Sequence, residues 1–212
     1  TISLEEAQAN KFPIEWKAED IHKPKFLGVK VIEDVTLSQI VDYIDWTPFF
    51  QTWELHGKFP RILEDEVVGV EAKKLFSDAQ KMLQQLVQEK WLTNKAVIGI
   101  WPANAVGDDI EIYSDESRNE VIAKHHMVRQ QSKKAKGEHN MSLADFVAPK
   151  ETGLADYMGG FAVTAGLGIE EHIERFEKDH DDYSSILLKA LDDRLAEAFT
   201  EFMHEKVRKE IW

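Results

Sequence analysis

Apolar residues recur along the chain at spacings that predict both helices and strands. The clearest helical pattern covers residues 67–90, where one apolar stripe consists of Val67, Val70, Leu75, Ala79, Met82, Leu83 and Leu86. Further helices are predicted over residues 4–11, 37–44 and 116–131, and as two helices between 169 and 212 with a break near 180–183. Strands are predicted at 27–35, 96–101, 109–113, 146–148 and 161–165. This mixed order favours an α+β fold with a twisted, largely antiparallel sheet.

The segment Tyr43–Pro60 holds the densest group of aromatic residues. Residues 46, 49, 50 and 53 are Trp or Phe, and their spacing places them on one helical face. Thr47 and Pro48 predict the start of this helix, as Thr36 does for residues 37–44. Asp45 lies just before the helix, so its carboxylate can accept hydrogen bonds from the backbone or bind the ammonium group of a ligand.

Three segments are predicted to be loops. Asn104–Asp109 joins two strands of an antiparallel hairpin, and Gly159–Gly160 lies in a second loop. The polar, basic segment 132–140 is predicted to be solvated and mobile.

Composition narrows the class of protein. With 212 residues and 43% hydrophobic residues the chain can form one or two domains with a substantial core. A net charge of -13 argues against nucleic-acid binding, and the absence of cysteine excludes disulfides, thiolate metal sites and thiol nucleophiles. Neither a run of about 18 apolar residues nor a signal-peptide pattern occurs, so a cytoplasmic location away from membranes is expected.

Two glycines follow the predicted strand at 161–165 and precede a helix, the order found in dinucleotide-binding motifs. The third glycine of that motif is replaced by Glu171, and acids at the helix start would repel a pyrophosphate. A structural turn is therefore the favoured interpretation of Gly166 and Gly168.

Two Glu-x-x-His pairs, Glu177 with His180 and Glu201 with His204, have the spacing of di-iron helical bundles. His180 lies in a polar run where a helix is predicted to end, which favours a surface role over a metal site. His125 and His126 diverge by roughly 100° on a helix and cannot share one ion. No hydrolase or zinc-protease motif is present.

A charged stripe along the last helix consists of Asp192, Asp193, Arg194, Glu197 and Glu201. A solvated face with internal ion pairs is the favoured interpretation. An acidic edge that faces a ligand is the alternative.

Six segments together resemble the C-terminal activation domain of cobalamin-dependent methionine synthase, in order and over nearly the whole chain: Tyr43–Phe50, Pro60–Ala72, Pro102–Asn104, Val106–Tyr113, Leu143–Lys150 and His180–Tyr183. The resemblance implies a C-shaped α+β domain of a methyltransferase. Such a domain binds S-adenosylmethionine for the reductive methylation of cob(II)alamin to methylcobalamin. It implies two partners, the cobalamin-binding domain of the same polypeptide and a flavodoxin or flavoprotein reductase.

The resemblance also assigns roles to individual residues. Asp45 matches an aspartate that contacts S-adenosylmethionine, and Glu197 matches a glutamate near the ligand. Asp193 resembles an acid on the face turned toward the cobalamin-binding domain. No catalytic acid, base or metal ligand is implied.

The family's Arg-Pro-x-Pro-Gly-Tyr-Pro segment, which holds the ligand, does not occur in this sequence. Residues 1–212 are therefore expected to correspond to the N-terminal two-thirds of the domain, with weak or no binding of S-adenosylmethionine by this chain alone. The alternative hypothesis is a non-catalytic module that docks on a corrinoid protein or a reductase.

Overall fold

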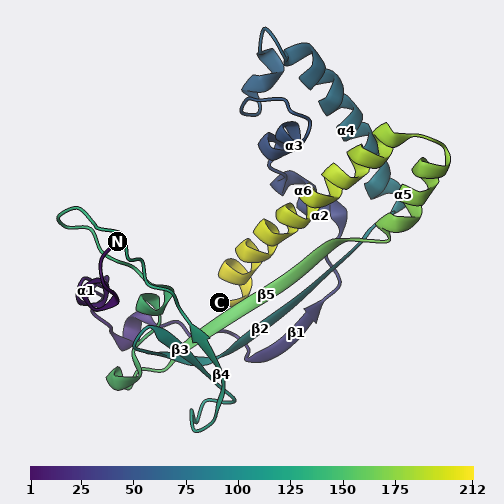
Figure 1. Cartoon of the computed structure of the whole chain (residues 1–212). Helices are drawn as coiled ribbons and strands as arrows, with labels where there is room; N and C mark the ends of the chain where they lie inside the picture. Colours follow the sequence, from purple (N-terminus) through teal and green to yellow (C-terminus); the bar gives the residue numbers. More distant parts are fainter. The chain divides into compact units, whose positions relative to one another are not determined.

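The computed structural model describes all residues, 1–212, and confirms the α+β class. One sheet contains β1 (Gly28–Ile32), β2 (Thr93–Val106), β3 (Asp109–Tyr113) and β4 (Val121–His126) in that order, and β5 (Asp156–Leu167) pairs with β2 (Figure 1). The α-helices are α1 (Leu4–Ala9), α2 (Leu37–Ile40), α3 (Trp46–Thr52), α4 (Gly69–Glu89), α5 (Ile169–Lys178) and α6 (Asp182–Lys206). None of these helices is long and apolar enough to cross a membrane.

The chain divides into two compact units. The first consists of Thr1–Lys30, Ile98–Gly160 and Glu210–Trp212, and the second of Val31–Val97 and Phe161–Lys209. Strands β2 and β5 contribute residues to both units.

The first unit is built on the antiparallel β2–β3 hairpin. Strand β2 extends further than predicted, to Val106, so the connection is a two-residue turn of Gly107 and Asp108, and Gly107 has a φ of 62°. In the hairpin Ala103 lies opposite Ile112 and Ala105 opposite Ile110, and these four side chains are buried. They form a core together with Ala144 and Val147.

Arg129 forms buried ion pairs that link separate segments of the first unit. Its side chain is 1% exposed and pairs with Asp108 at 2.6 Å and with Asp145 at 2.6 Å. A further Arg129 N–H group donates to the Asn140 carbonyl at 2.7 Å. The Arg129 hydrogen bonds lower the pKa of Asp108. Burial raises the pKa of Asp145, but hydrogen bonds from Arg129 and the Ser142 amide outweigh burial and hold that pKa below its usual value.

Several sequence predictions for this unit are wrong. Residues 116–131 do not form a helix: Val121–His126 is strand β4, paired antiparallel with β3. All six side chains of β4 are exposed, so the order of apolar and polar residues does not show which face is buried. The segment is a strand because its backbone pairs with the edge of β3.

The segment 146–148 is not a strand, contrary to the prediction: Phe146 is the last residue of a 3₁₀ turn, Leu143–Phe146, that a capping box between Ser142 and Asp145 starts. Gly159 and Gly160 lie within β5, not in a loop. A Cβ at Gly159 would approach Ile100 of β2 to 3.2 Å, so glycine permits close packing of the two strands. Within the segment predicted to be solvated, Asn140 is fully buried.

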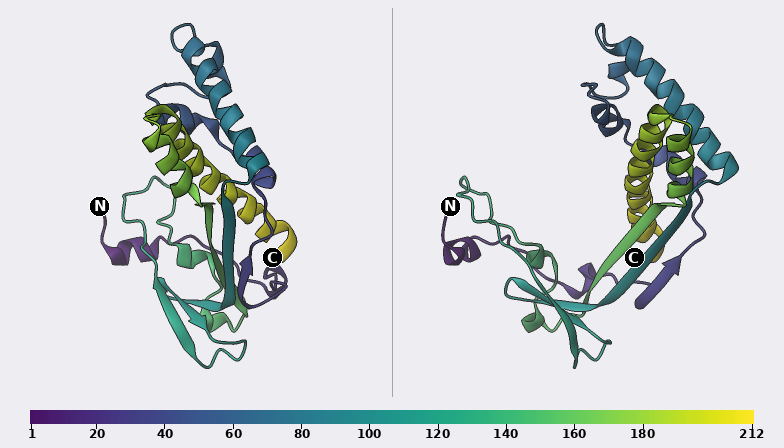
Figure 2. Two further views of the ribbon diagram at one scale, coloured as in Figure 1. Left: turned by 90° about the vertical axis from the view of Figure 1, so that its right-hand side faces the viewer. Right: turned by 45° about the vertical axis from the view of Figure 1, so that its right-hand side comes forward.

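The second unit is organised around α6, which packs against α2, α3, α4 and α5. Figure 2 shows α6 beside α4 in two views. Asp181 starts α6 by accepting a hydrogen bond from the Ser184 amide at 3.0 Å. Leu187, Leu188, Leu191, Leu195 and Phe199 are buried along the helix. The predicted break between the last two helices is confirmed at residues 179–181.

The long helix predicted over 67–90 is confirmed as α4, but the start of its buried stripe differs from the prediction. Val67 and Val70 are 90% and 85% exposed, whereas Ala72 and Gly69 face the interior. Counting back from Leu75 in steps of three leads to these two small residues, so Val70 is out of phase with the stripe. A Cβ at Gly69 would lie 2.9 Å from the Leu63 carbonyl, which explains the glycine.

The turn between β5 and α5 also depends on glycines. Gly168 has a φ of 103°, and a Cβ there would lie 2.9 Å from the Trp91 carbonyl. A Cβ on Gly166 would lie 2.1 Å from Oδ1 of Asp192 on α6. These contacts support the structural interpretation of both glycines.

Asp192 is the unusual partner in this packing. Its Oδ1 is buried and has no hydrogen-bond partner. Burial, and then the nearby acids Asp193 and Glu170, raise the pKa of Asp192. Because the folded state disfavours the charged carboxylate, Asp192 lowers stability as pH rises above the value at which it ionises in the unfolded chain.

We expect Arg129→Met to lower the free energy of unfolding by about 3–5 kcal/mol at neutral pH, because it leaves two carboxylates without their buried partner. Urea unfolding measures this loss. The pairing contributes above the unfolded-state pKa of the two aspartates and is lost as pH falls through their lowered folded values. The difference between the variant and the parent should therefore shrink in acid; a constant difference would contradict this account.

We expect Gly166→Ala to destabilise the chain by about 1–3 kcal/mol through its clash with Asp192. Asp192→Ala should instead stabilise it by about 1 kcal/mol at neutral pH, since an unpaired buried acceptor is removed. In the double variant the clash is relieved, so the two effects should not add. Asp193→Ala, at an exposed neighbour, is the control and should change stability by less than about 0.5 kcal/mol.

Candidate functional site

Asp45 is the residue before the first turn of α3 and caps that helix. Its Oδ1 accepts a hydrogen bond from the Thr47 amide at 2.9 Å. The capping residue is therefore Asp45, not Thr47 as the sequence suggested. The hydroxyl of Thr47 instead accepts a hydrogen bond from the Phe59 amide at 3.2 Å. Asp45 is exposed, and its second carboxylate oxygen has no hydrogen-bond donor from the chain.

The aromatic residues of the same segment form a rigid base for α3. Phe49 and Phe50 are fully buried, which confirms the predicted helical face. Trp46 meets Phe76 of α4 edge to face, with ring centroids 4.9 Å apart. Asp45 thus projects from a helix end whose position is fixed by packing.

The charged stripe of α6 contains internal ion pairs, as predicted. Arg194 bonds to Glu197 and, at 2.9 Å, to Asp193. The Arg194 side chain is 13% exposed, whereas those of Asp193 and Glu197 are 76% and 51% exposed. Both acids therefore face solvent above a largely covered guanidinium. Asp192, by contrast, does not belong to the solvated stripe.

Asp45 and Glu197 lie in the same unit, on helices that pack against each other. In the same unit, the Tyr43 hydroxyl donates to Glu205 of α6 at 2.8 Å, and the Tyr43 ring meets Phe202. The two carboxylates share no hydrogen-bond partner, because Asp45 binds the Thr47 amide and Glu197 binds Arg194. Two separate, exposed acids on one compact unit suit the recognition of a cationic ligand by charge-assisted hydrogen bonds.

The histidine motifs do not come together. His180 adopts a φ of 57° between α5 and α6, and Glu177 pairs with Lys189 at 3.6 Å. His125 and His126 lie on strand β4, where adjacent side chains point to opposite faces. His126 bonds to Asp109 at 2.9 Å. No group of three or more His, Asp or Glu side chains is arranged to hold a metal ion.

Arg118 and Asn104 have structural roles that the sequence patterns did not predict. Arg118 has a φ of 57°, donates to the Asn104 side chain at 2.8 Å and to the Asp156 carbonyl at 2.8 Å, and lies over the Tyr113 ring. Asn104 in turn donates to the carbonyls of Ala148 and Leu154 at 2.9 Å each. Asn104 belongs to the segment Pro102–Asn104, which resembles the family, and its hydrogen bonds join β2 to the chain at Ala148 and Leu154 in the first unit.

Comparison with known proteins supplies the family. A model of the vitamin B12 dependent methionine synthase activation domain matches residues 36–212. A crystal structure described as the MetH reactivation domain bound to AdoHcy is 55% identical, with a TM-score of 0.92. The match covers 100% of this chain and 64% of that one, so this chain spans less than two thirds of the matched structure. Given this fold and the extent of both matches, the chain belongs to the activation-domain family of vitamin B12-dependent methionine synthases.

Proposed function

We propose that this chain forms part of the module that reactivates a cobalamin-dependent methionine synthase, a methyltransferase, by binding S-adenosylmethionine. The observation that carries the proposal is the similarity to a reactivation domain bound to AdoHcy. AdoHcy is the molecule that remains when S-adenosylmethionine has given up its methyl group. A protein that holds the product in this way is suited to hold the donor.

The protein's part in such a reaction is positioning. The sulfonium of S-adenosylmethionine is already an activated methyl donor, and cobalamin held by a neighbouring domain would supply the nucleophilic metal. Neither role requires a general base from this chain. The proposed role of Asp45 and Glu197 is to orient the ligand.

Asp45 is the proposed contact for the amino group of S-adenosylmethionine. Capping fixes one carboxylate oxygen on the Thr47 amide and leaves the other free to accept from a cation. Glu197 is the second proposed contact and would share its charge between Arg194 and the ligand. Asp193, the more exposed acid beside it, is the proposed contact for the cobalamin-binding domain. A flavodoxin or flavoprotein reductase is the proposed electron donor.

We expect Asp45→Asn, in the complete enzyme, to weaken S-adenosylmethionine binding by about tenfold or more, because a charge-assisted hydrogen bond becomes a neutral one. Asparagine caps helices as well as aspartate does, so the thermal unfolding temperature should stay unchanged. Reactivation should slow while primary turnover with methyltetrahydrofolate continues. Isothermal titration and the two activity assays measure these effects.

The matched control is Asp181→Asn, which makes the same change at the capping residue of α6. It should leave ligand binding unchanged. Equal loss of both activities in Asp45→Asn would assign Asp45 to folding instead. Intact S-adenosylmethionine binding in that variant would remove Asp45 from the site.

We also propose that residues outside these 212 contribute to the ligand site, as the family's Arg-Pro-x-Pro-Gly-Tyr-Pro segment implies. The 212-residue chain should then bind S-adenosylmethionine weakly or not at all in isothermal titration, whereas the longer domain binds it. Micromolar binding by the 212-residue chain would overturn this part of the proposal.

A further inference from the structure

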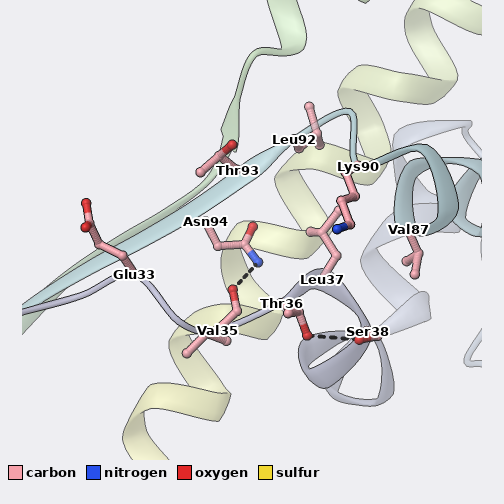
Figure 3. A pocket seen from close by; sticks show the side chains of 10 residues that line it. All are labelled: Glu33, Val35, Thr36, Leu37, Ser38, Val87, Lys90, Leu92, Thr93 and Asn94. Carbon is pink, nitrogen blue, oxygen red and sulfur yellow. Dashed lines mark hydrogen bonds between the residues drawn. The ribbon is translucent and has the colours of Figure 1, made fainter.

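The segment of chain that leads to Asp45 is held in place from its start. Asn94, near the beginning of β2, is 4% exposed, and its Nδ2 donates to the Val35 carbonyl at 3.2 Å (Figure 3). Helix α2 follows directly, packs against α6 and buries Leu37 and Ile40. The path of the chain is therefore set by packing before it reaches Asp45.

Tyr43 is the last point of attachment, two residues before Asp45. Its hydroxyl donates to Oε2 of Glu205 on α6 at 2.8 Å, and its ring meets Phe202 of the same helix edge to face, with centroids 5.6 Å apart. The bond to Glu205, and then burial, raise the pKa of Tyr43. Lys209, and then Tyr43, lower the pKa of Glu205. The bond therefore joins a neutral hydroxyl to a charged carboxylate at neutral pH.

The same helix carries Glu197, the second proposed ligand contact. Glu197 and Glu205 are eight residues apart on α6, which corresponds to about 12 Å along the helix axis and about 80° around it. Ile44, between Tyr43 and Asp45, is buried, so no flexible loop separates the attachment point from the capping residue. A shift of Tyr43 on α6 would therefore change the separation of Asp45 from Glu197.

We propose that Tyr43 is a positioning residue for the binding of S-adenosylmethionine. Its bond to Glu205 holds the entry of α3 on α6, so that Asp45 and Glu197 stay at the separation at which one ligand reaches both. This inference rests on the proposed function, since it takes both acids as ligand contacts. Without the bond the two carboxylates keep their chemistry, but the ligand must order them, and that ordering reduces its affinity.

In the complete enzyme, Tyr43→Phe should weaken S-adenosylmethionine binding about three- to tenfold in isothermal titration, up to the value of one hydrogen bond. The matched control is Tyr183→Phe. The Tyr183 hydroxyl of α6 donates to Asp78 of α4 at 3.1 Å, so this variant loses the same kind of bond between two helices of the same unit. It should shift the thermal unfolding temperature by a similar amount and keep the parental affinity. Equal weakening in both variants would show a general loss of rigidity and overturn the positioning role.

Variants of Glu205 test whether the bond, and not the charge, is responsible. Glu205→Gln keeps an oxygen that can accept from Tyr43, so its affinity should stay within about twofold of the parent, whereas Glu205→Ala should match Tyr43→Phe. The double variant of Tyr43→Phe with Glu205→Ala should bind no more weakly than either single variant. Additive losses, or equal losses in the Gln and Ala variants, would overturn the inference.

The final comparison separates this inference from the proposed function. In the Asp45→Asn background, Tyr43→Phe should weaken binding by less than about twofold, because the contact that it positions is already impaired. If Asp45→Asn weakens binding and Tyr43→Phe does not, the positioning role alone is wrong. If Asp45→Asn leaves binding intact, the assignment of Asp45 fails and the role of Tyr43 fails with it.

Discussion

The pairing of backbone groups along β2 is the constraint on which the rest of the structure depends. This strand, Thr93–Val106, pairs with β3 and β5 and lies next to β1 in the sheet, so three of the other four strands depend on its position. Its residues also supply both compact units. Ala103 and Ala105 enter the core of the first unit, whereas Asn94 bonds to Val35 in the second. Small side chains on the strand allow close packing where larger ones would not fit.

The two units are stabilised by different interactions: buried ion pairs in the first and apolar packing in the second. The first has a small apolar core and relies on buried polar groups, above all the guanidinium of Arg129 between Asp108 and Asp145. Removing one partner of such a buried pair is costly, because the other charge is left buried without compensation. The second unit packs leucines and aromatic rings around α6. That apolar base leaves Asp45 at the start of α3, and Asp193 and Glu197 along α6, exposed to solvent.

The acids of the second unit show how one residue type takes different roles in different surroundings. Asp45 caps a helix and keeps one oxygen free, and Asp193 and Glu197 share a guanidinium at the surface. Asp192 is half-buried against Gly166, and its buried Oδ1 has no donor. Only the first three have the exposure that recognition of a cationic ligand requires. The fourth, Asp192, lowers stability at neutral pH, because its carboxylate lies against Gly166 of β5 with a buried oxygen that has no donor.

Local patterns in the sequence determined most helices, the β2–β3 hairpin and the aromatic face of α3, because periodicity, caps and glycines act over a few residues. The resemblance of six short segments was enough to predict the family. Tertiary structure alone decided three other matters. It made Val121–His126 a strand, because the backbone of this segment pairs with the edge of β3. It placed the Leu63 carbonyl so close to Gly69 that no side chain fits there, a contact that the helical phase does not predict. It also separated Asp192 from the solvated stripe, because a strand packs over that position and no sequence spacing records such a distant contact.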